Sequence, residues 1–294
     1  MTTIYRCLSA GLMVLAISVL PNIAAAETAD KYTLRYRFKV GEVLRWEVEH
    51  RAKTDTTIEG DSQTADTLSK SVKAWRVQRL GADGSATFEH TVEWIEMRQR
   101  LTGREEVCYD SRTDKEPPTV FQQVAKSVGV PLSVVTVDPQ GKVLERVRTK
   151  ARPKNQSEGE ITIPLPEEPV AVGHVWSFIH DVSVPLNTGG IRKVKTQQRF
   201  KLAGVKTGVA TIEVSNHLLT PIDDPKLESQ LLQRQSSGTV KFDIDAGRVL
   251  SQRMELDKRV VGFSGPTSSI HYATRFSERL LPPTSKVATR PTGR

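Results

Sequence analysis

The stretch VGEVLRWEVEH, residues 40–50, alternates large apolar side chains with charged ones. Leu44, Trp46 and Val48 share one face of an extended chain, and Arg45 shares the other face with two glutamates. Period-two alternation predicts a strand of an antiparallel sheet with one buried face and one wet face. The same alternation recurs at residues 32–38, 70–80, 85–97 and 132–138. We therefore predict an all-β protein whose long strands form curved antiparallel meanders.

A similar stretch, VGHVWSFIHDV at residues 172–182, indicates that the fold uses this strand twice. Two further landmark pairs follow in the same order: Gly-x-Ala-Thr-[Phe/Ile]-Glu at 84–89 and 208–213, and Gly-[Lys/Arg]-Val-Leu at 141–144 and 247–250. Shared landmarks in one order predict an internal duplication. The repeat keeps Gly41 as Gly173 but changes Glu42 to His174. We therefore interpret it as a repeated strand entry at a bend, and not as a repeated active site.

The duplication and the composition set the expected organisation of the chain. We predict two related curved antiparallel β-meander modules, at residues 27–148 and 161–281, that form a half-barrel or a sandwich-like structure. Residues 149–160 are polar and aperiodic, so we predict a linker there, and we expect a disordered tail at 282–294.

Two segments depart from period two. Residues 118–129 place apolar side chains at helical spacing between Pro118 and Gly129, which predicts a short amphipathic helix that covers the sheet. Residues 224–235 form a second candidate helix with Asp224 as its N-cap, although an irregular crossing or an extended strand stays open there.

The first 26 residues have the layout of a secretory signal peptide. Arg6 precedes an apolar run at 8–20, and the small residues at 24–26 predict cleavage between Ala26 and Glu27. The apolar run is short for a bilayer span, so we expect a secreted or periplasmic protein that does not span the membrane. Cys7 lies before the apolar run, which leaves no lipidation cysteine at the cleavage site. Cys108 then has no partner for an internal disulfide, and we expect a buried or half-buried structural thiol.

Composition and motifs argue against several function classes. The formal charge of the chain is +8 and falls to +7 once the segment with Arg6 is removed. Basic and acidic residues are interleaved along the chain, so we do not expect nucleic-acid binding. The chain lacks the common cofactor, phosphate-binding and zinc-protease motifs, and we predict no cofactor, no metal and no catalytic residue. His174 and His180 would lie about 20 Å apart on one strand, too far for one metal. Glu89 and Glu93 are expected on a wet face. A triad assembled from distant residues stays open.

Three segments carry a resemblance to a known family: LRYRFKVGEVLRWEVEH at 34–50, LPEEPVAVGHVWSF at 165–178 and FDIDAGRVLSQRMEL at 242–256. Together they resemble a family of secreted bacterial proteins, frequent in planctomycetes, that is catalogued as domain of unknown function 6263. The resemblance covers nearly the whole mature chain and implies its fold and its export. Its motifs are structural glycines and strand patterns, so it transfers no catalytic residue.

The aromatic residues are the strongest lead to function. Trp46, Trp75, Trp94, Trp176 and Phe178 lie at the parity of the core, either as core residues or as the lining of a cavity. The candidate cavity-lining residues are Leu44, Trp46, Trp176 and Phe178. We favour a non-enzymatic binding protein or an envelope-associated structural protein, with a lipid, another apolar ligand or an envelope component as partner. The alternative is a hydrolase with a site at the junction of the two halves.

Overall fold

The computed structural model describes residues 30–149, 161–185 and 189–283. Antiparallel strands dominate it, the main sheet does not close on itself, and the helices are short. The all-β prediction is therefore confirmed. The predicted signal peptide, its cleavage site at Ala26 and Glu27, and most of the predicted linker and tail lie outside the described residues.

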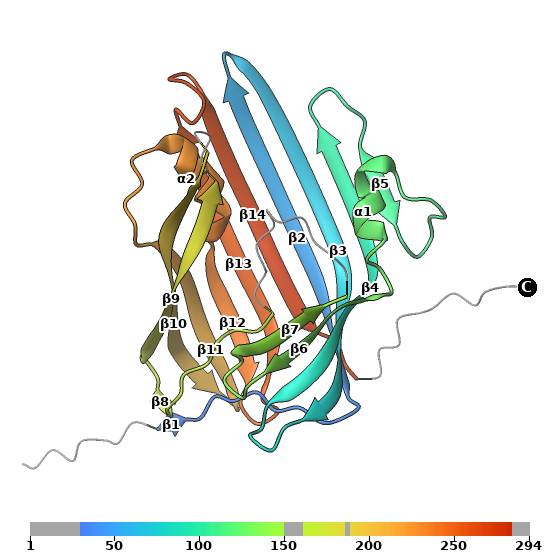
Figure 1. Cartoon of the computed structure of the whole chain (residues 1–294), viewed down its shortest axis with the longest axis vertical. Coiled ribbons are helices and arrows are strands. Elements are labelled where there is room, and N and C mark those ends of the chain that lie inside the picture. The colour runs from blue at the N-terminus through green and yellow to red at the C-terminus, as the bar shows by residue number, and fades with distance from the viewer. Residues whose placement is uncertain (1–29, 150–160, 186–188, 284–294) are drawn as a thin grey trace, which may run out of the picture.

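Twelve strands form one sheet in the order β7-β6-β4-β3-β2-β14-β13-β12-β11-β10-β9, with β5 paired to β4 (Figure 1). The first half contributes β2 (Val43–Ile58), β3 (Asp61–Leu80), β4 (Ala86–Leu101), β5 (Val107–Asp110), β6 (Pro131–Val137) and β7 (Val143–Arg148). The second half contributes β9 (Val175–Pro185), β10 (Ile191–Lys206), β11 (Val209–Leu218), β12 (Ser237–Asp243), β13 (Arg248–Val261) and β14 (Ser269–Leu280). Strands β1 (Lys31–Tyr32) and β8 (Val170–Ala171) pair separately.

The two halves meet edge to edge between β2 and β14. These strands pair from Thr57 opposite Ser269 to Trp46 opposite Leu280, so one continuous sheet contains strands from both halves. Each half enters the sheet through a turn at a glycine with positive φ, Gly41 at 81° and Gly173 at 92°. Glycine adopts this conformation without the steric cost that a side chain adds, and the predicted bends are confirmed.

The sheet is curved, and the helices lie against one of its faces (Figure 1). We call the face that carries Trp46 and Phe276 the inner face, and the face that carries Glu47 and Arg279 the outer face. The alternation predicted for residues 43–50 is confirmed, because Leu44 and Trp46 are buried on the inner face while Glu47 forms an ion pair on the outer one.

An apolar base fills one end of the inner face. Its side chains come from the strands and from the segments 34–38 and 161–165, and the largest are Tyr36, Trp46, Trp75, Phe88, Trp176, Phe200 and Phe242. Buried aromatic and aliphatic side chains of this size dominate the energetics of a core. This end of the half-barrel is therefore packed solid.

The prediction of a strand at residues 32–38 is wrong beyond Tyr32. The segment stays extended but crosses the base, because its backbone donors find acceptors in two hairpin turns and not in a neighbouring strand. Tyr36 N–H donates to Pro139 O at 2.7 Å, and Arg37 N–H donates to Gly247 O at 2.9 Å. The second turn approaches this segment closely, since a Cβ on Gly247 would lie 2.6 Å from the backbone nitrogen of Arg37. Glycine permits this approach.

Short helices cover both flanks of the inner face. Residues 119–121 form one 3₁₀ turn that continues into α1 (Gln122–Ala125), and Phe121 packs there against Ile95 and Tyr109. The predicted first helix is confirmed. The second, α2 (Pro225–Leu231), is followed by a 3₁₀ turn at Leu232–Arg234. The Asp224 carboxylate accepts a hydrogen bond from Lys226 N–H, so the predicted helix and its cap are also confirmed.

Trp94 is buried, but it does not face the core as its parity predicts. A β-bulge leaves Glu93 unpaired, so that Val92 lies opposite Lys73 while Trp94 lies opposite Val72. One extra residue in a strand moves every later side chain of that strand to the opposite face of the sheet. Trp94 therefore lies on the outer face, where the Arg112 guanidinium stacks 3.9 Å from its ring centroid.

Candidate ligand-binding site

A pocket of about 350 Å³ lies on the inner face, next to the apolar base, and we call it the inner chamber. Both halves of the chain line it, through β2, β3, β4, β13 and β14. Its apolar wall consists of Val48, Trp75, Val92, Ile161, Ile163 and Phe276. A concave site of this size with mainly apolar walls is typical of small-molecule binding.

The chamber also contains an ion pair between the two halves. Lys73 Nζ on β3 lies 2.7 Å from Glu278 Oε2 on β14, and only 18% and 8% of the two side chains are exposed. The ammonium group also lies over two indole rings, 5.1 Å from the ring centroid of Trp46 and 5.2 Å from that of Trp75. The ion pair and these cation–π contacts hold the ammonium group against the chamber wall.

His90 on β4 faces the chamber from the neighbouring strand. Burial, together with the positive charges of Lys73 and Arg146, lowers the pKa of its imidazole to about 4. The imidazole is therefore neutral at neutral pH.

Three buried polar atoms lie in one row across the strands. Trp75 is the cross-strand neighbour of His90, and His90 is the neighbour of Ser133 on β6. Within the described part of the chain, Trp75 Nε1, His90 Nδ1 and Ser133 Oγ have no hydrogen-bond partner. Buried polar groups are almost always paired in folded proteins, so this row departs from the usual pattern. Trp75 and His90 belong to the chamber lining, whereas Ser133 does not.

The structure brings together two of the four residues predicted to line a cavity. Leu44 and Trp46 are packed in the base below the chamber, and the Trp46 indole N–H donates to Val249 O at 3.0 Å. Trp176 belongs to the other part of the base and donates to Pro164 O at 3.0 Å, whereas Phe178 lies on the edge strand β9 with 42% of its surface exposed.

The chamber residues Lys73, His90 and Glu278 were not among those candidates. A weak signal for two of them was present in the sequence. Lys73 has the parity of Trp75, and Glu278 has the parity of Phe276, so each places a charge in an otherwise apolar stripe. Charged groups are rarely buried without a partner, which makes such positions candidate sites.

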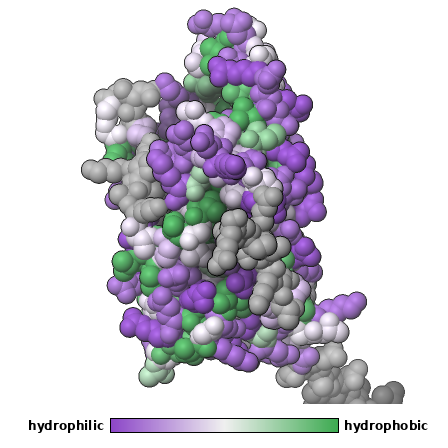
Figure 2. Space-filling view, turned by 90° about the vertical axis from the view of Figure 1, so that its right-hand side faces the viewer, coloured by the Kyte–Doolittle hydropathy of each residue, from purple (hydrophilic) through white to green (hydrophobic). Residues whose placement is uncertain are grey.

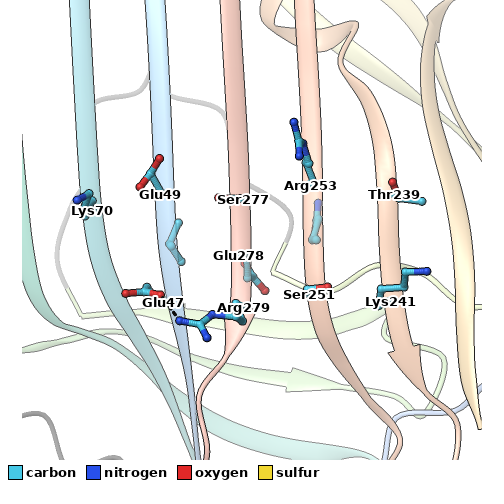
Figure 3. Close-up of a pocket in the computed structure, with 12 residues that line it drawn as sticks. Glu47, Glu49, Lys70, Thr239, Lys241, Ser251, Arg253, Ser277, Glu278 and Arg279 are labelled. Atoms are coloured by element: carbon cyan, nitrogen blue, oxygen red, sulfur yellow. Dashed lines mark hydrogen bonds and ion pairs between the residues drawn. The ribbon is translucent and has the colours of Figure 1, made fainter.

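The outer face carries an open groove of about 460 Å³ with a different character. Figure 3 shows its side chains standing on β3, β2, β14, β13 and β12, with Glu47 and Arg279 joined as an ion pair. Lysines, arginines and glutamates alternate along it, so neither sign of charge dominates. Hydrophilic residues also surround small separate hydrophobic patches on the side of the molecule near β4 and β5 (Figure 2). These surfaces match the solvated two-sign surface expected from the sequence.

Other candidate chemistry is dispersed over the molecule. Cys108 is exposed, so the expectation of a buried or half-buried thiol is wrong; it lies on the short outermost strand β5, which leaves its side chain uncovered. Glu93 lies on the outer face, paired with Arg45 at 2.9 Å. Within residues 30–149, 161–185 and 189–283, no group of three His, Cys, Asp or Glu side chains could hold a metal ion.

No family model matches the sequence, and no curated protein resembles it significantly. Among solved structures, the chain is similar to one described as "Lipid-protein interactions in lipovitellin", at a TM-score of 0.43 and 12% identity, over 86% of this chain and 27% of that one. DynF from the dynemicin biosynthesis pathway of Micromonospora chersina gives a TM-score of 0.23 and 8% identity, over 91% and 92% of the two chains. At these TM-scores neither likeness defines a function. None of the helices in the described residues is long and apolar enough to cross a bilayer.

Proposed function

We propose that this protein is a non-enzymatic binding protein that holds a small ligand with apolar parts in the inner chamber. The observation that carries this proposal is the chamber itself, a concave space between the two halves whose apolar wall lies beside the buried Lys73–Glu278 ion pair and His90. We also propose that the protein is secreted or periplasmic, which the signal-like sequence before Glu27 supports.

The internal duplication and the family relationship also stay proposals. They are supported by the three repeated landmarks, whose glycines have positive φ in both halves, as at Gly84 and Gly208. Both halves place their Gly-[Lys/Arg]-Val-Leu turns against the same segment, around Tyr36 and Arg37. A duplicated module would produce this arrangement, with one central segment held between two equivalent turns.

The chamber geometry favours binding over the alternative of a hydrolase. The serine that pairs with His90 across the strands is Ser133, which does not line the chamber. Ser133 Oγ and His90 Nδ1 do not bond to each other, and an imidazole with a pKa of about 4 is a weak base at neutral pH. Activation of a serine needs a hydrogen-bonded base of suitable pKa.

Native mass spectrometry of the full chain, purified from its own envelope after signal removal, tests the binding function. We expect a co-purifying small molecule of defined mass, and we expect Ser71→Trp, which fills the chamber, to abolish it. Ser251→Trp on the outer groove is the matched control and retains the ligand. An apo protein in both the native chain and the control would contradict the proposal, and turnover of nitrophenyl esters that His90→Gln abolishes would favour the hydrolase.

A further inference from the structure

We infer that two copies of this chain associate through the edge of β9 and extend the sheet by antiparallel pairing, with Ile179 of one copy opposite Ile179 of the other. This inference is independent of the proposed binding function. It follows from three observations: the backbone groups at the edge of β9, the comparison of β9 with β2, and the self-complementary sequence of β9.

The edge of β9 offers backbone groups for strand pairing. Among the described strands, only β10 pairs with β9, in a register without shifts. Just before β9, His174 O accepts a hydrogen bond from Leu202 N–H of β10, and successive residues of a strand direct their backbone groups to opposite sides. The N–H and C=O groups of Ser177, Ile179 and Asp181 therefore point away from β10, where a further strand can pair with them.

The position of β9 in its half of the chain is that of β2 in the other half. Strands β2, β3, β4, β6 and β7 pair in the same order as β9, β10, β11, β12 and β13. The repeated glycine turn precedes both β2 and β9, so Trp46 corresponds to Phe178. Strand β14 covers the other edge of β2, and Trp46 is 1% exposed, whereas Phe178 is 42% exposed. Strand β9 therefore lacks the neighbour that buries its counterpart.

The next residue indicates which kind of neighbour fits. Glu47 on β2 lies opposite Arg279 of β14 and forms an ion pair with it at 2.8 Å. The corresponding residue of β9 is Ile179, which is 60% exposed on the outer face. Directly opposite side chains in a sheet stabilise each other when they are alike in polarity. An apolar residue of a second copy therefore fits this position better than a charged peptide.

The sequence of β9 is self-complementary around Ile179. A two-fold axis at this residue places Ser177 opposite Asp181 of the second copy, where the hydroxyl can donate to the carboxylate. The same axis places the Phe178 ring opposite the imidazole of His180. A register centred on Asp181 would instead oppose two carboxylates, which is unfavourable. We therefore assign the two-fold axis to Ile179.

The edge of β9 also lacks the features that keep edge strands from pairing. It is 11 residues long, carries Asp181 but no lysine or arginine, and has its proline at its last position. The strand at the other edge of the sheet, β7, has 6 residues and carries Glu145, Arg146 and Arg148. Short and charged edge strands resist pairing. The interface is therefore expected at β9 and not at β7.

The charges beside the interface permit a dimer. Lys193, Lys195 and Arg199 are exposed on the outer face of β10, the strand next to β9. In the dimer the two β10 strands lie about 14 Å apart, because three strand spacings separate them. This distance exceeds the Debye length of about 8 Å at physiological ionic strength, so the repulsion is largely screened. Added salt should strengthen the dimer, whereas it would weaken the binding of an acidic peptide at the same edge.

Sedimentation velocity of the full chain, after signal removal, tests the inference. We expect a monomer–dimer equilibrium in the micromolar range, because one added strand buries less surface than a standard interface. Ile179→Lys places two ammonium groups opposite each other and should weaken the dimer at least about ten-fold. Val261→Lys on β13 changes a valine of similar exposure, 61%, and is the matched control that keeps the dimer. A chain that stays monomeric at about 100 μM, or a dimer that Ile179→Lys leaves intact, would overturn the inference.

Disulfide cross-linking tests the register in a Cys108→Ser background. Ile179→Cys places two thiols on Cα atoms about 5.5 Å apart across the interface, within the reach of a disulfide. Ser177→Cys is the control, because its two copies lie about 14 Å apart along the strands. We expect mild oxidation to give a covalent dimer of the first variant alone, as seen by non-reducing electrophoresis. Cross-linking at residue 177 without cross-linking at residue 179 would contradict the assigned axis and overturn the inference.

Discussion

Lys73 and Glu278 form a buried ion pair that links the first half of the chain to the second, with 2.7 Å between Nζ and Oε2. The two residues lie on opposite sides of β2, because Lys73 pairs with Trp46 and Glu278 pairs with Val48. They are therefore diagonal neighbours across the strand at which the halves join. The same pair contributes charge to the inner chamber, so one interaction serves both the joint and the proposed site.

Removal of one partner of this pair should be costly. Glu278→Gln leaves the Lys73 ammonium buried without a counter-charge, and we expect a loss of about 3 kcal/mol in the free energy of unfolding. Urea denaturation measures it. Glu47→Gln breaks the exposed pair with Arg279 and should cost less than about 1 kcal/mol. Equal losses for the two variants would show that the inner pair is solvated.

Stability should fall as the pH is lowered from about 6.5 to about 4. Burial and the charges of Lys73 and Arg146 lower the pKa of His90 from 6.5 to about 4. In this window the unfolded chain binds a proton that the folded chain does not, so folding is penalised by about 3 kcal/mol when the window has been crossed.

His90→Gln should remove most of this pH dependence, as measured by denaturation at several pH values. His50, whose pKa burial also lowers, leaves a slope of the same sign. A variant with the slope of the native chain would show that His90 is hydrated in the folded protein.

Gly238 should not tolerate a side chain. It lies on β12 opposite Met254, and a Cβ would lie 1.9 Å from Arg253 O. Gly238→Ala therefore forces β12 and β13 apart, and we expect a loss of about 2 kcal/mol or more in thermal or urea unfolding. At Gly204, a Cβ would meet nothing within 4 Å, so Gly204→Ala should be neutral or stabilising by up to about 1 kcal/mol. Equal effects at the two sites would contradict the close approach.

Cys108 should react slowly for an exposed thiol. Partial burial and the nearby Glu106 carboxylate raise its pKa, which lowers the fraction of reactive thiolate at neutral pH. Glu106→Gln removes the negative charge, lowers the pKa and should speed alkylation about two-fold, which a thiol assay follows. An unchanged rate would show that the Glu106 carboxylate does not raise this pKa.

Much of the secondary structure could be predicted from local patterns. Period-two alternation located β2, β3, β4 and β6, and helical spacing with its caps located both helices. These signals are local, because the face on which a side chain lies depends on its immediate neighbours in the chain. The same rule failed at Trp94, where one bulged residue reversed the face, and at Tyr36, whose extended segment bonds to turns instead of to a strand.

The sequence by itself determined the fold class, the repeated glycine turns and the wet and apolar faces of the strands, since each depends on residues close together in the chain. Only the tertiary structure decided that β14 pairs with β2, and this pairing brings Lys73 beside Glu278, 205 residues away. It also decided that Trp46 lies within the packed base, that Trp75 belongs to both the base and the chamber wall, and that His90 faces the chamber. Strand pairing is set by the burial of all the apolar faces together, so a pattern within one strand does not specify its partner.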